Sequence, residues 1–136
     1  MDKRPYKILI VEDEVIVALD LQSRLERLGY IVLDTFMSGE EACEKVLELQ
    51  PDLVLMDIQL GGGMDGIETA KAIQAYLEIP VVFITAYADK NIIDQLDSNA
   101  SYAFIRKPFN EQELHKAIEV ALETKPDVEV EPVKAL

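Results

Sequence analysis

The sequence predicts an α/β fold: a doubly wound, five-stranded parallel sheet with helices on both faces. Three observations predict it. Five short apolar runs recur along the chain, segments with helical periodicity separate them, and 136 residues are about the length of one domain. Strands that alternate with helices pair in parallel through right-handed crossovers, and the helices then cover both faces of the sheet.

The five apolar runs predict the strands, because nearly continuous aliphatic segments are typical of strands that are buried on both faces. The first run reads KILIV, whereas Asp34 interrupts the second. The expected strands are residues 7–11, 31–36, 53–56, 81–84 and 102–105.

The segments between these runs have the apolar spacing of amphipathic helices. Two of them open on the pattern of a capping box, in which a polar side chain and a glutamate three residues later bond each other's backbone. These pairs are Ser38 with Glu41 and Asn110 with Glu113. The segment 89–98 has the shortest apolar pattern. The expected helices are residues 14–28, 38–49, 66–77, 89–98 and 110–123.

The domain organisation expected from these elements is simple. Residues 1–123 hold all five strands and helices and are expected to form one domain. Residues 124–136 carry two prolines and alternate acidic with apolar residues, so we expect a tail or a linker there.

The charge balance excludes some classes of partner. The chain has 13 basic and 26 acidic residues, a formal net charge of −13. Such an acidic surface repels nucleic acid and anionic lipid. No apolar run approaches the roughly 18 residues of a membrane span. We therefore expect neither direct nucleic-acid binding nor membrane insertion.

Cysteine and histidine usage narrows the metal chemistry. Cys43 is the one cysteine and His115 the one histidine. A single cysteine forms no internal disulfide, which is consistent with a reducing cytoplasm. One residue of each type also excludes a zinc site built from histidine and cysteine, so any metal must be bound by oxygen.

Polar side chains follow four of the predicted strands, at the carboxyl ends where parallel α/β sheets bind their ligands. Glu12 and Asp13 follow the first strand, Asp57 the third, Thr85 the fourth and Lys107 the fifth. Two like charges ~4 Å apart repel by about 4 kcal/mol at an effective dielectric of ~20, and one lysine does not neutralise three carboxylates. The cluster therefore predicts a Mg²⁺ site, with Mn²⁺ as a substitute, whose open positions suit a phosphoryl group.

These residue types are sufficient for phosphoryl transfer. An aspartate carboxylate can accept a phosphoryl group and form an aspartyl phosphate. Because the carboxylate is already ionised, no general base is needed to activate this nucleophile. Mg²⁺ and Lys107 would neutralise charge on the transferring oxygens, and Thr85 would donate a hydrogen bond to one of them.

Five segments carry a resemblance to a known family. They are LIVEDE (9–14), PDLVLMDIQL (51–60), MDG (64–66), VVFITAY (81–87) and FIRKPF (104–109). Over residues 5–123 the chain resembles the receiver domain of two-component response regulators. The resemblance implies a flavodoxin-like fold with strand order 2-1-3-4-5.

The resemblance also implies a role for each acidic residue. Asp57 matches the phosphoacceptor. Asp13 matches a direct Mg²⁺ ligand, Glu12 matches one that acts through water, and Gln59 matches the position whose backbone carbonyl completes the metal site.

Three further positions match the groups that bind and report the phosphoryl group. Thr85 and Lys107 match the hydroxyl and the lysine that contact the phosphate, and Phe104 matches the switch aromatic. Phosphorylation is then expected to change the surface formed by helix 89–98, strand 102–105 and helix 110–123.

The expected function is phosphoryl acceptance in two-component signalling, not enzymatic turnover, with slow self-dephosphorylation. The chain is expected to be cytoplasmic, and the donor would be a sensor histidine kinase or a phosphotransfer protein. An output domain or a second copy of the chain would bind the switching surface. The chain fits both a stand-alone receiver and the receiver part of a longer regulator or hybrid kinase.

Three other functions compete with this one. A phosphatase with an aspartate nucleophile needs a second aspartate two residues later, where this chain has Gln59. A flavin-binding electron carrier of the same architecture needs a phosphate-binding loop after the first strand, where the acidic Glu12 and Asp13 stand. A degenerate receiver that acts only as a docking module would not need the complete acceptor set.

The chain departs from the family pattern in the loop after the third strand. Gly61, Gly62 and Gly63 make this loop one residue longer than in many receivers and leave it without proline, so we expect greater mobility. The switch aromatic is also a phenylalanine, which lacks a hydroxyl. A cis Lys107–Pro108 bond is expected, because the lysine must turn sharply toward the carboxylates.

Overall fold

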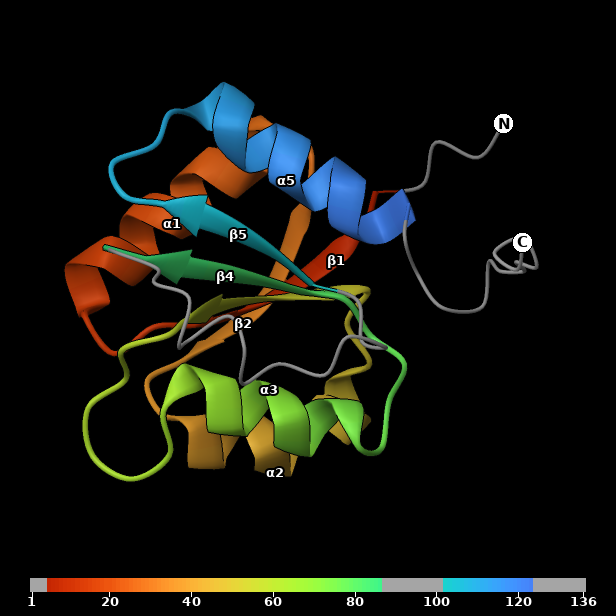
Figure 1. The fold of residues 1–136 in the computed structure, drawn as a ribbon. Helices are drawn as coiled ribbons and strands as arrows, with labels where there is room; N and C mark the ends of the chain where they lie inside the picture. Colours follow the sequence, from red (N-terminus) through yellow and green to blue (C-terminus); the bar gives the residue numbers. More distant parts are fainter. Residues whose placement is uncertain (1–4, 87–101, 124–136) are drawn as a thin grey trace, which may run out of the picture.

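The computed structural model describes residues 5–86 and 102–123, and its sheet has the predicted architecture (Figure 1). Five parallel strands lie in the order β2-β1-β3-β4-β5, which confirms the flavodoxin-like topology. The strands are β1 (Lys7–Val11), β2 (Ile31–Phe36), β3 (Leu53–Asp57), β4 (Val81–Thr85) and β5 (Tyr102–Arg106).

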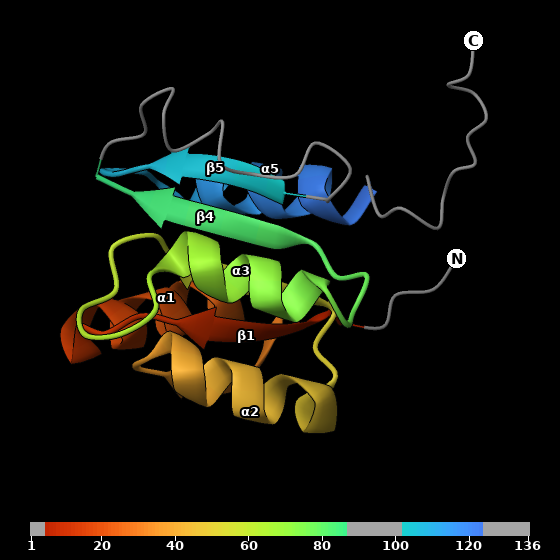
Figure 2. The ribbon, with the colours of Figure 1, turned by 60° about the horizontal axis from the view of Figure 1, so that its bottom comes forward.

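Helices cover both faces of this sheet. Figures 1 and 2 show α1 and α5 on one face and α2 and α3 on the other. Their bounds are α1 (Val15–Arg27), α2 (Gly39–Leu49), α3 (Gly66–Gln74) and α5 (Glu111–Glu123). The predicted helix 89–98 and the predicted tail 124–136 lie outside the described residues.

The core has two layers because successive strand side chains point to opposite faces. On β1, Leu9 and Val11 pack toward α2 and α3, whereas Ile8 and Ile10 pack toward α1 and α5. Burial of each such side chain stabilises the fold by roughly 1.5–3 kcal/mol. The helices contribute the apolar face that their spacing predicted: Ala42, Val46, Ile67, Ala70 and Ile73 in one layer, and Leu21, Leu25, Leu114 and Ile118 in the other.

The helix starts are capped much as the sequence predicts. Asn110 and Glu113 form a reciprocal capping box, at 2.8 and 2.9 Å. The Ser38 hydroxyl accepts from the Glu41 N–H at 3.1 Å, but the Glu41 carboxylate bonds the Met37 N–H, one residue before the expected partner.

Helix α3 is shorter than predicted. It ends at Gln74 rather than at residue 77, although Leu77 still packs against the core. The Leu77 N–H bonds the Ile73 carbonyl at 3.0 Å, so a turn beyond the helix places this side chain inward. No helix among the described residues is long and apolar enough to span a membrane.

Candidate functional site

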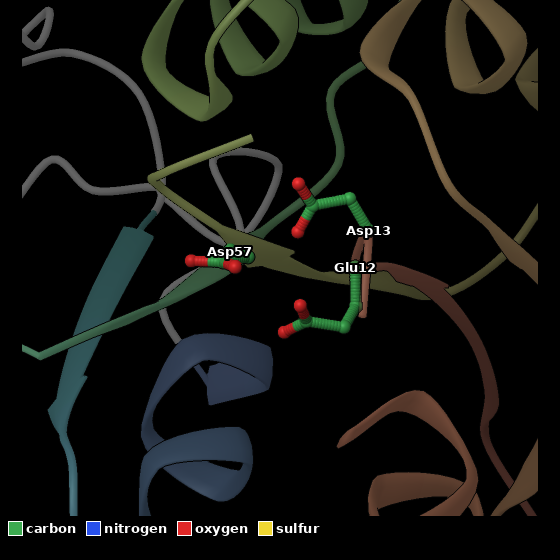
Figure 3. A group of neighbouring side chains, drawn as sticks. All are labelled: Glu12, Asp13 and Asp57. Atoms are coloured by element: carbon green, nitrogen blue, oxygen red, sulfur yellow. The ribbon is translucent and has the colours of Figure 1, made fainter. Parts of the chain in front are cut away.

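Three carboxylates converge at the carboxyl ends of β1 and β3 (Figure 3). Glu12 and Asp13 follow β1, Asp57 ends β3, and these two strands are parallel neighbours with Val11 opposite Met56. One carboxylate oxygen from each residue lies within 4.8 Å of the others. The structure therefore brings together the three acids that the sequence placed at this edge of the sheet. We call them the acidic triad.

Glu12 is the most deeply buried member of the triad, with 1% of its surface exposed. One carboxylate oxygen accepts from the Glu14 N–H at 3.0 Å, and among the described residues no donor reaches Oε1. The pKa of Glu12 is raised to about 7, mainly by burial and also by the negative charge of Asp57. The Lys107 charge and the Glu14 hydrogen bond oppose this rise.

Asp57 is also buried, with 6% of its surface exposed. Its Oδ1 accepts from the Gln59 N–H at 3.1 Å. Burial raises the pKa of the Asp57 carboxyl, while this hydrogen bond and the nearby Lys107 charge lower it. The backbone behind Asp57 is tightly packed, because a Cβ on Gly66 would lie 2.2 Å from the Asp57 carbonyl oxygen.

The glycine-rich loop after β3 folds back onto the triad. The Gly61 N–H donates to Asp13 Oδ2 at 2.9 Å, and the Met64 N–H donates to Glu40 on α2 at 3.0 Å. Between them Gly62 has φ +82°, a left-handed conformation that glycine adopts readily. Carboxylates thus bond this loop near both of its ends.

Thr85 and Lys107 stand at the ends of the neighbouring strands. Thr85 is buried at the end of β4, and its carbonyl accepts from the Lys107 N–H at 2.9 Å. The positive charge of Lys107 lowers the pKa of both Glu12 and Asp57, so the lysine lies close enough to act on these two carboxylates. The Lys107–Pro108 bond is cis, as expected.

Phe104 lies on β5 and is half-buried. Its ring stacks on Phe83 of β4 at 5.3 Å between centroids, and Tyr102 meets it edge-on at 5.7 Å. The aromatic side chain is therefore packed on the sheet in this structure. Its role as a switch stays a prediction, as does metal binding by the carbonyl of Gln59, whose side chain is exposed.

The chemistry of the triad fits a hard divalent cation. All of its donor atoms are oxygens, and Mg²⁺ is bound in proteins through one or two carboxylates with water and phosphate oxygens. The unpartnered Oε1 of Glu12 is the second argument, because a buried carboxylate oxygen without a donor is costly unless a proton or a cation compensates it.

Sequence reasoning missed two features around the site. Asp65 and Glu68 form a capping box that starts α3, a pattern that the spacing Asp-x-x-Glu before an apolar run could have indicated. Arg24 on α1 contacts Phe109, which lies 85 positions further along the chain. No local signal could have found that contact, because it depends on how α1 packs beside α5.

The sequence pattern of the response regulator receiver domain matches residues 8–119, which include every residue of the site. The chain belongs to this family. It is a receiver domain of the kind used in two-component signalling.

Curated relatives of this receiver domain are bacterial regulators. It is 33% identical over 118 residues to the transcriptional regulatory protein PdtaR of Mycobacterium tuberculosis, covering 87% of the chain and 57% of the relative. It is 35% identical over 117 residues to the phyllosphere-induced regulator PhyR of Methylorubrum extorquens, covering 85% of the chain and 43% of PhyR. The chain thus spans about half the length of these relatives.

Solved structures agree with the fold. The signal receiver domain of a modulated diguanylate cyclase from Desulfovibrio desulfuricans is 38% identical, with a TM-score of 0.83 over 93% of this chain and 100% of that one. The receiver domain of PhyR from Erythrobacter litoralis is 31% identical, with a TM-score of 0.78 over 90% of this chain and 93% of that one.

Proposed function

We propose that this receiver domain is a cytoplasmic phosphoryl acceptor, which takes the group onto Asp57 from a phosphohistidine of a sensor kinase or a phosphotransfer protein. One observation carries the proposal. The carboxylate oxygens of Glu12, Asp13 and Asp57 lie within 4.8 Å of one another, beside a lysine and a threonine from the next two strands. Each group that the chemistry needs is present at one edge of the sheet.

Asp57 is the nucleophile in this proposal. One of its carboxylate oxygens bonds to phosphorus, the P–N bond of the phosphohistidine breaks, and the bonding electron pair stays on the imidazole. The Gln59 N–H and the Lys107 charge stabilise the ionised carboxylate that this attack requires.

The remaining side chains would hold the transferring oxygens. The Lys107 ammonium group, which follows β5, would stabilise their negative charge. The Thr85 hydroxyl at the end of β4 would donate a hydrogen bond to one of them. Glu12 and Asp13 would hold Mg²⁺ together with Asp57. When bound, this ion would neutralise negative charge on the phosphoryl oxygens.

Exposed apolar side chains beside the site support docking of a partner protein. Val15, Ile16 and Leu19 follow the acidic pair on α1, and they are 54%, 81% and 61% exposed. Water-exposed side chains of this size on one helix are typical of interaction surfaces when they lie together. A phosphodonor that binds there would bring its histidine to the edge of the sheet that holds Asp57.

The phosphorylated state would be read on β5 and α5. The added group carries roughly −2 charge and demands donors, so Thr85 would move toward it. Phe104 would then turn into the volume that Thr85 leaves. An output domain or a second copy of the chain would bind the changed surface, which also includes the predicted helix 89–98.

The competing functions are less well supported. A phosphatase of the aspartate type lacks its acid–base group, because Gln59 stands at that position. A docking module without phosphorylation would not need to bury Glu12 and Asp57 beside a lysine, at a cost in desolvation.

Phosphorylation by acetyl phosphate tests the proposal. With Mg²⁺ present, the wild type should gain one phosphoryl group that hydroxylamine removes, and Asp57→Asn should gain none. Asp52→Asn is the matched control, because Asp52 lies at the other end of β3 and its carboxylate accepts a hydrogen bond from the Lys7 N–H. Labelling that persists in Asp57→Asn on a serine or threonine would contradict the assignment.

A further inference from the structure

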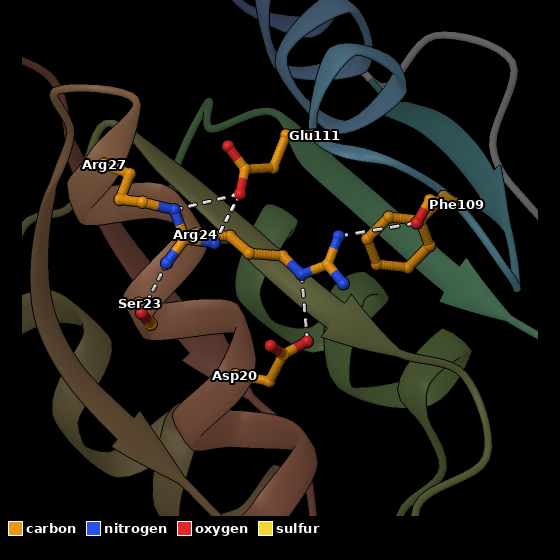
Figure 4. Close-up of polar contacts among 6 residues, drawn as sticks. All are labelled: Asp20, Ser23, Arg24, Arg27, Phe109 and Glu111. Atoms are coloured by element: carbon orange, nitrogen blue, oxygen red, sulfur yellow. Dashed lines mark hydrogen bonds and ion pairs between the residues drawn. The ribbon is translucent and has the colours of Figure 1, made fainter.

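We propose that Arg24 on α1 is a positioning residue for phosphoryl transfer, which fixes the chain after Lys107 so that the lysine ammonium faces the phosphoryl group (Figure 4). This role rests on the proposed function, because it acts through Lys107. The side chain of Arg24 contacts Asp20 and Phe109, so it would act on the site through the segment that carries Lys107.

The guanidinium of Arg24 makes three contacts. Nη1 donates to the Phe109 carbonyl at 3.4 Å, and the guanidinium carbon lies 5.6 Å from the centroid of the Phe109 ring. Nε donates to Asp20 Oδ2 at 2.9 Å. Asp20 lies one turn earlier on α1, so this ion pair orients the guanidinium toward Phe109, as Figure 4 shows.

These contacts hold a short segment that carries the lysine of the site. Lys107 is two residues before Phe109. At one end of the segment the Lys107 N–H bonds the Thr85 carbonyl at 2.9 Å, and at the other end Arg24 bonds the Phe109 carbonyl. With both ends fixed, the Lys107 side chain starts from a defined backbone position, which pre-organises its charge for the transferring oxygens.

Arginine suits this role in a way that lysine does not. A planar guanidinium can donate in two directions and stack on a ring at the same time, whereas an ammonium group is a compact point charge. The Arg24 side chain is 27% exposed, so its contacts are partly shielded from water. Arg24 bonds the backbone carbonyl of Phe109 rather than a charged side chain, so this contact fixes the backbone of the segment.

Arg27 supplies a matched comparison on the same face of the same helix. Its Nε and Nη2 bond the Glu111 carboxylate, and its Nη1 donates to Ser23 at 2.9 Å. These contacts join α1 to the first turn of α5, and they do not include residues 107–109. Arg27 therefore shares with Arg24 a contact from α1 to the chain after β5, but it does not contact the segment that carries Lys107.

Beryllofluoride, a mimic of the phosphoryl group on aspartate, tests the role by ¹⁹F NMR titration with Mg²⁺ present. Arg24→Met should weaken beryllofluoride binding roughly tenfold, the scale of one charge-assisted hydrogen bond. Arg27→Met should change it by less than about twofold, because its contacts leave Lys107 in place. The Mg²⁺ affinity of Arg24→Met should stay near the wild-type value, since the triad lies on other strands.

A double-mutant cycle separates positioning from general loosening of the fold. In a Lys107→Ala background, Arg24→Met should have no further effect on beryllofluoride binding, because the group that it positions is gone. Phe109→Leu, which removes the ring but keeps the carbonyl, provides a second variant and should show the same coupling to Lys107. Equal losses with and without Lys107 would overturn the role and would mark Arg24 as structural.

The outcomes also separate this role from the proposed function. If the wild type binds beryllofluoride and Arg24→Met binds it equally well, the positioning role is wrong and the phosphoryl-acceptor function stands. If the wild type binds none, the proposed function fails, and the role of Arg24 fails with it.

Discussion

Glu12 and Asp57 bring carboxylate oxygens within 4.8 Å of each other across the adjacent strands β1 and β3, and both carboxyl groups have a raised pKa. Burial is the main cause for each, and their mutual proximity makes ionisation of both costly. In the free protein the site therefore favours holding a proton. A bound cation removes that preference, so proton release and metal binding are linked.

The first prediction is that Mg²⁺ affinity rises with pH through about 7, the pKa of Glu12. Below that pH, Mg²⁺ must displace a proton from Glu12, and above it the carboxylate is already ionised. Calorimetric titrations between pH 5.5 and pH 8.5 measure this dependence. Glu12→Gln should flatten it over the same range, and an unchanged slope in that variant would contradict the assignment of the proton to Glu12.

The same raised pKa predicts how the stability of the metal-free protein depends on pH. The pKa of Glu12 is about 7 when folded against an ordinary value of 4.5. The folded state thus binds a proton that the unfolded state has lost between these values. Its stabilising contribution is fully present below pH 4.5 and is lost as the pH rises through about 7. Asp57 acts in the same direction.

Urea denaturation at pH 5, 6, 7 and 8 measures this stability. The free energy of unfolding should fall across the series for the metal-free wild type relative to Glu12→Gln. Saturating Mg²⁺ should reduce the fall, because the cation compensates the ionised carboxylates. If the free energy of unfolding of the wild type differs from that of Glu12→Gln by the same amount at all four pH values, Glu12 does not hold the buried proton.

The second prediction concerns the ligand role of Asp13. Asp13→Asn should weaken Mg²⁺ binding by more than roughly tenfold, since even outer-shell groups of metal sites contribute on that scale. Glu14→Gln is the control, because it removes the same charge from an exposed neighbour. If both variants lose affinity equally, net charge rather than ligation explains the effect.

The third prediction uses the close packing behind Asp57. Gly66→Ala should destabilise the fold by about 3 kcal/mol, because the new Cβ would lie 2.2 Å from the Asp57 carbonyl oxygen and 2.6 Å from the Ile58 Cα. Gly63→Ala should cost less, about 1 kcal/mol, because the atom that it meets is the end of the flexible Glu40 side chain, which loses at most its hydrogen bond from the Met64 N–H.

Chemical denaturation compares the two variants directly. Gly66→Ala should also slow phosphorylation by acetyl phosphate, since the backbone that carries Asp57 must shift. A Gly66→Ala protein as stable as Gly63→Ala would show that the start of α3 can move away from β3 without cost.

The sequence predicts the fold and the site for one physical reason: parallel strands align their carboxyl ends. Once the apolar runs are assigned, residues as far apart as Asp13, Asp57 and Lys107 must meet at one edge. The prediction needs only the order of strands and the residue after each. It therefore tolerates errors such as the end of α3, which stops at Gln74 rather than at residue 77.

Contacts that depend on packing between helices are different. The bond from Arg24 to the Phe109 carbonyl requires the relative placement of α1 and α5, which apolar periodicity does not specify. The same holds for the Gly61 N–H on Asp13, because three glycines leave the loop path undetermined. The strands determine where the site lies. The contacts that orient its side chains and loop depend on packing that the sequence pattern does not specify.

The last prediction concerns how phosphorylation reaches β5. Thr85 ends β4 and is buried, and it lies opposite Arg106 of β5. A phosphoryl group on Asp57 demands hydrogen-bond donors, so the Thr85 hydroxyl should move toward it and vacate volume near Phe104. Phe104 already stacks on Phe83 at 5.3 Å between centroids, so an inward turn must break or reshape this stack. The change is a shift between two packed arrangements, driven by the differential affinity of the donor groups for the phosphoryl group.

Amide hydrogen exchange in residues 86–106, with and without beryllofluoride, measures this conformational change. Wild-type exchange there should change on binding, and Thr85→Ala should still accept phosphoryl, more slowly, with a smaller change. Unaltered exchange in the wild type, with Mg²⁺ and beryllofluoride demonstrably bound, would place the output on another surface.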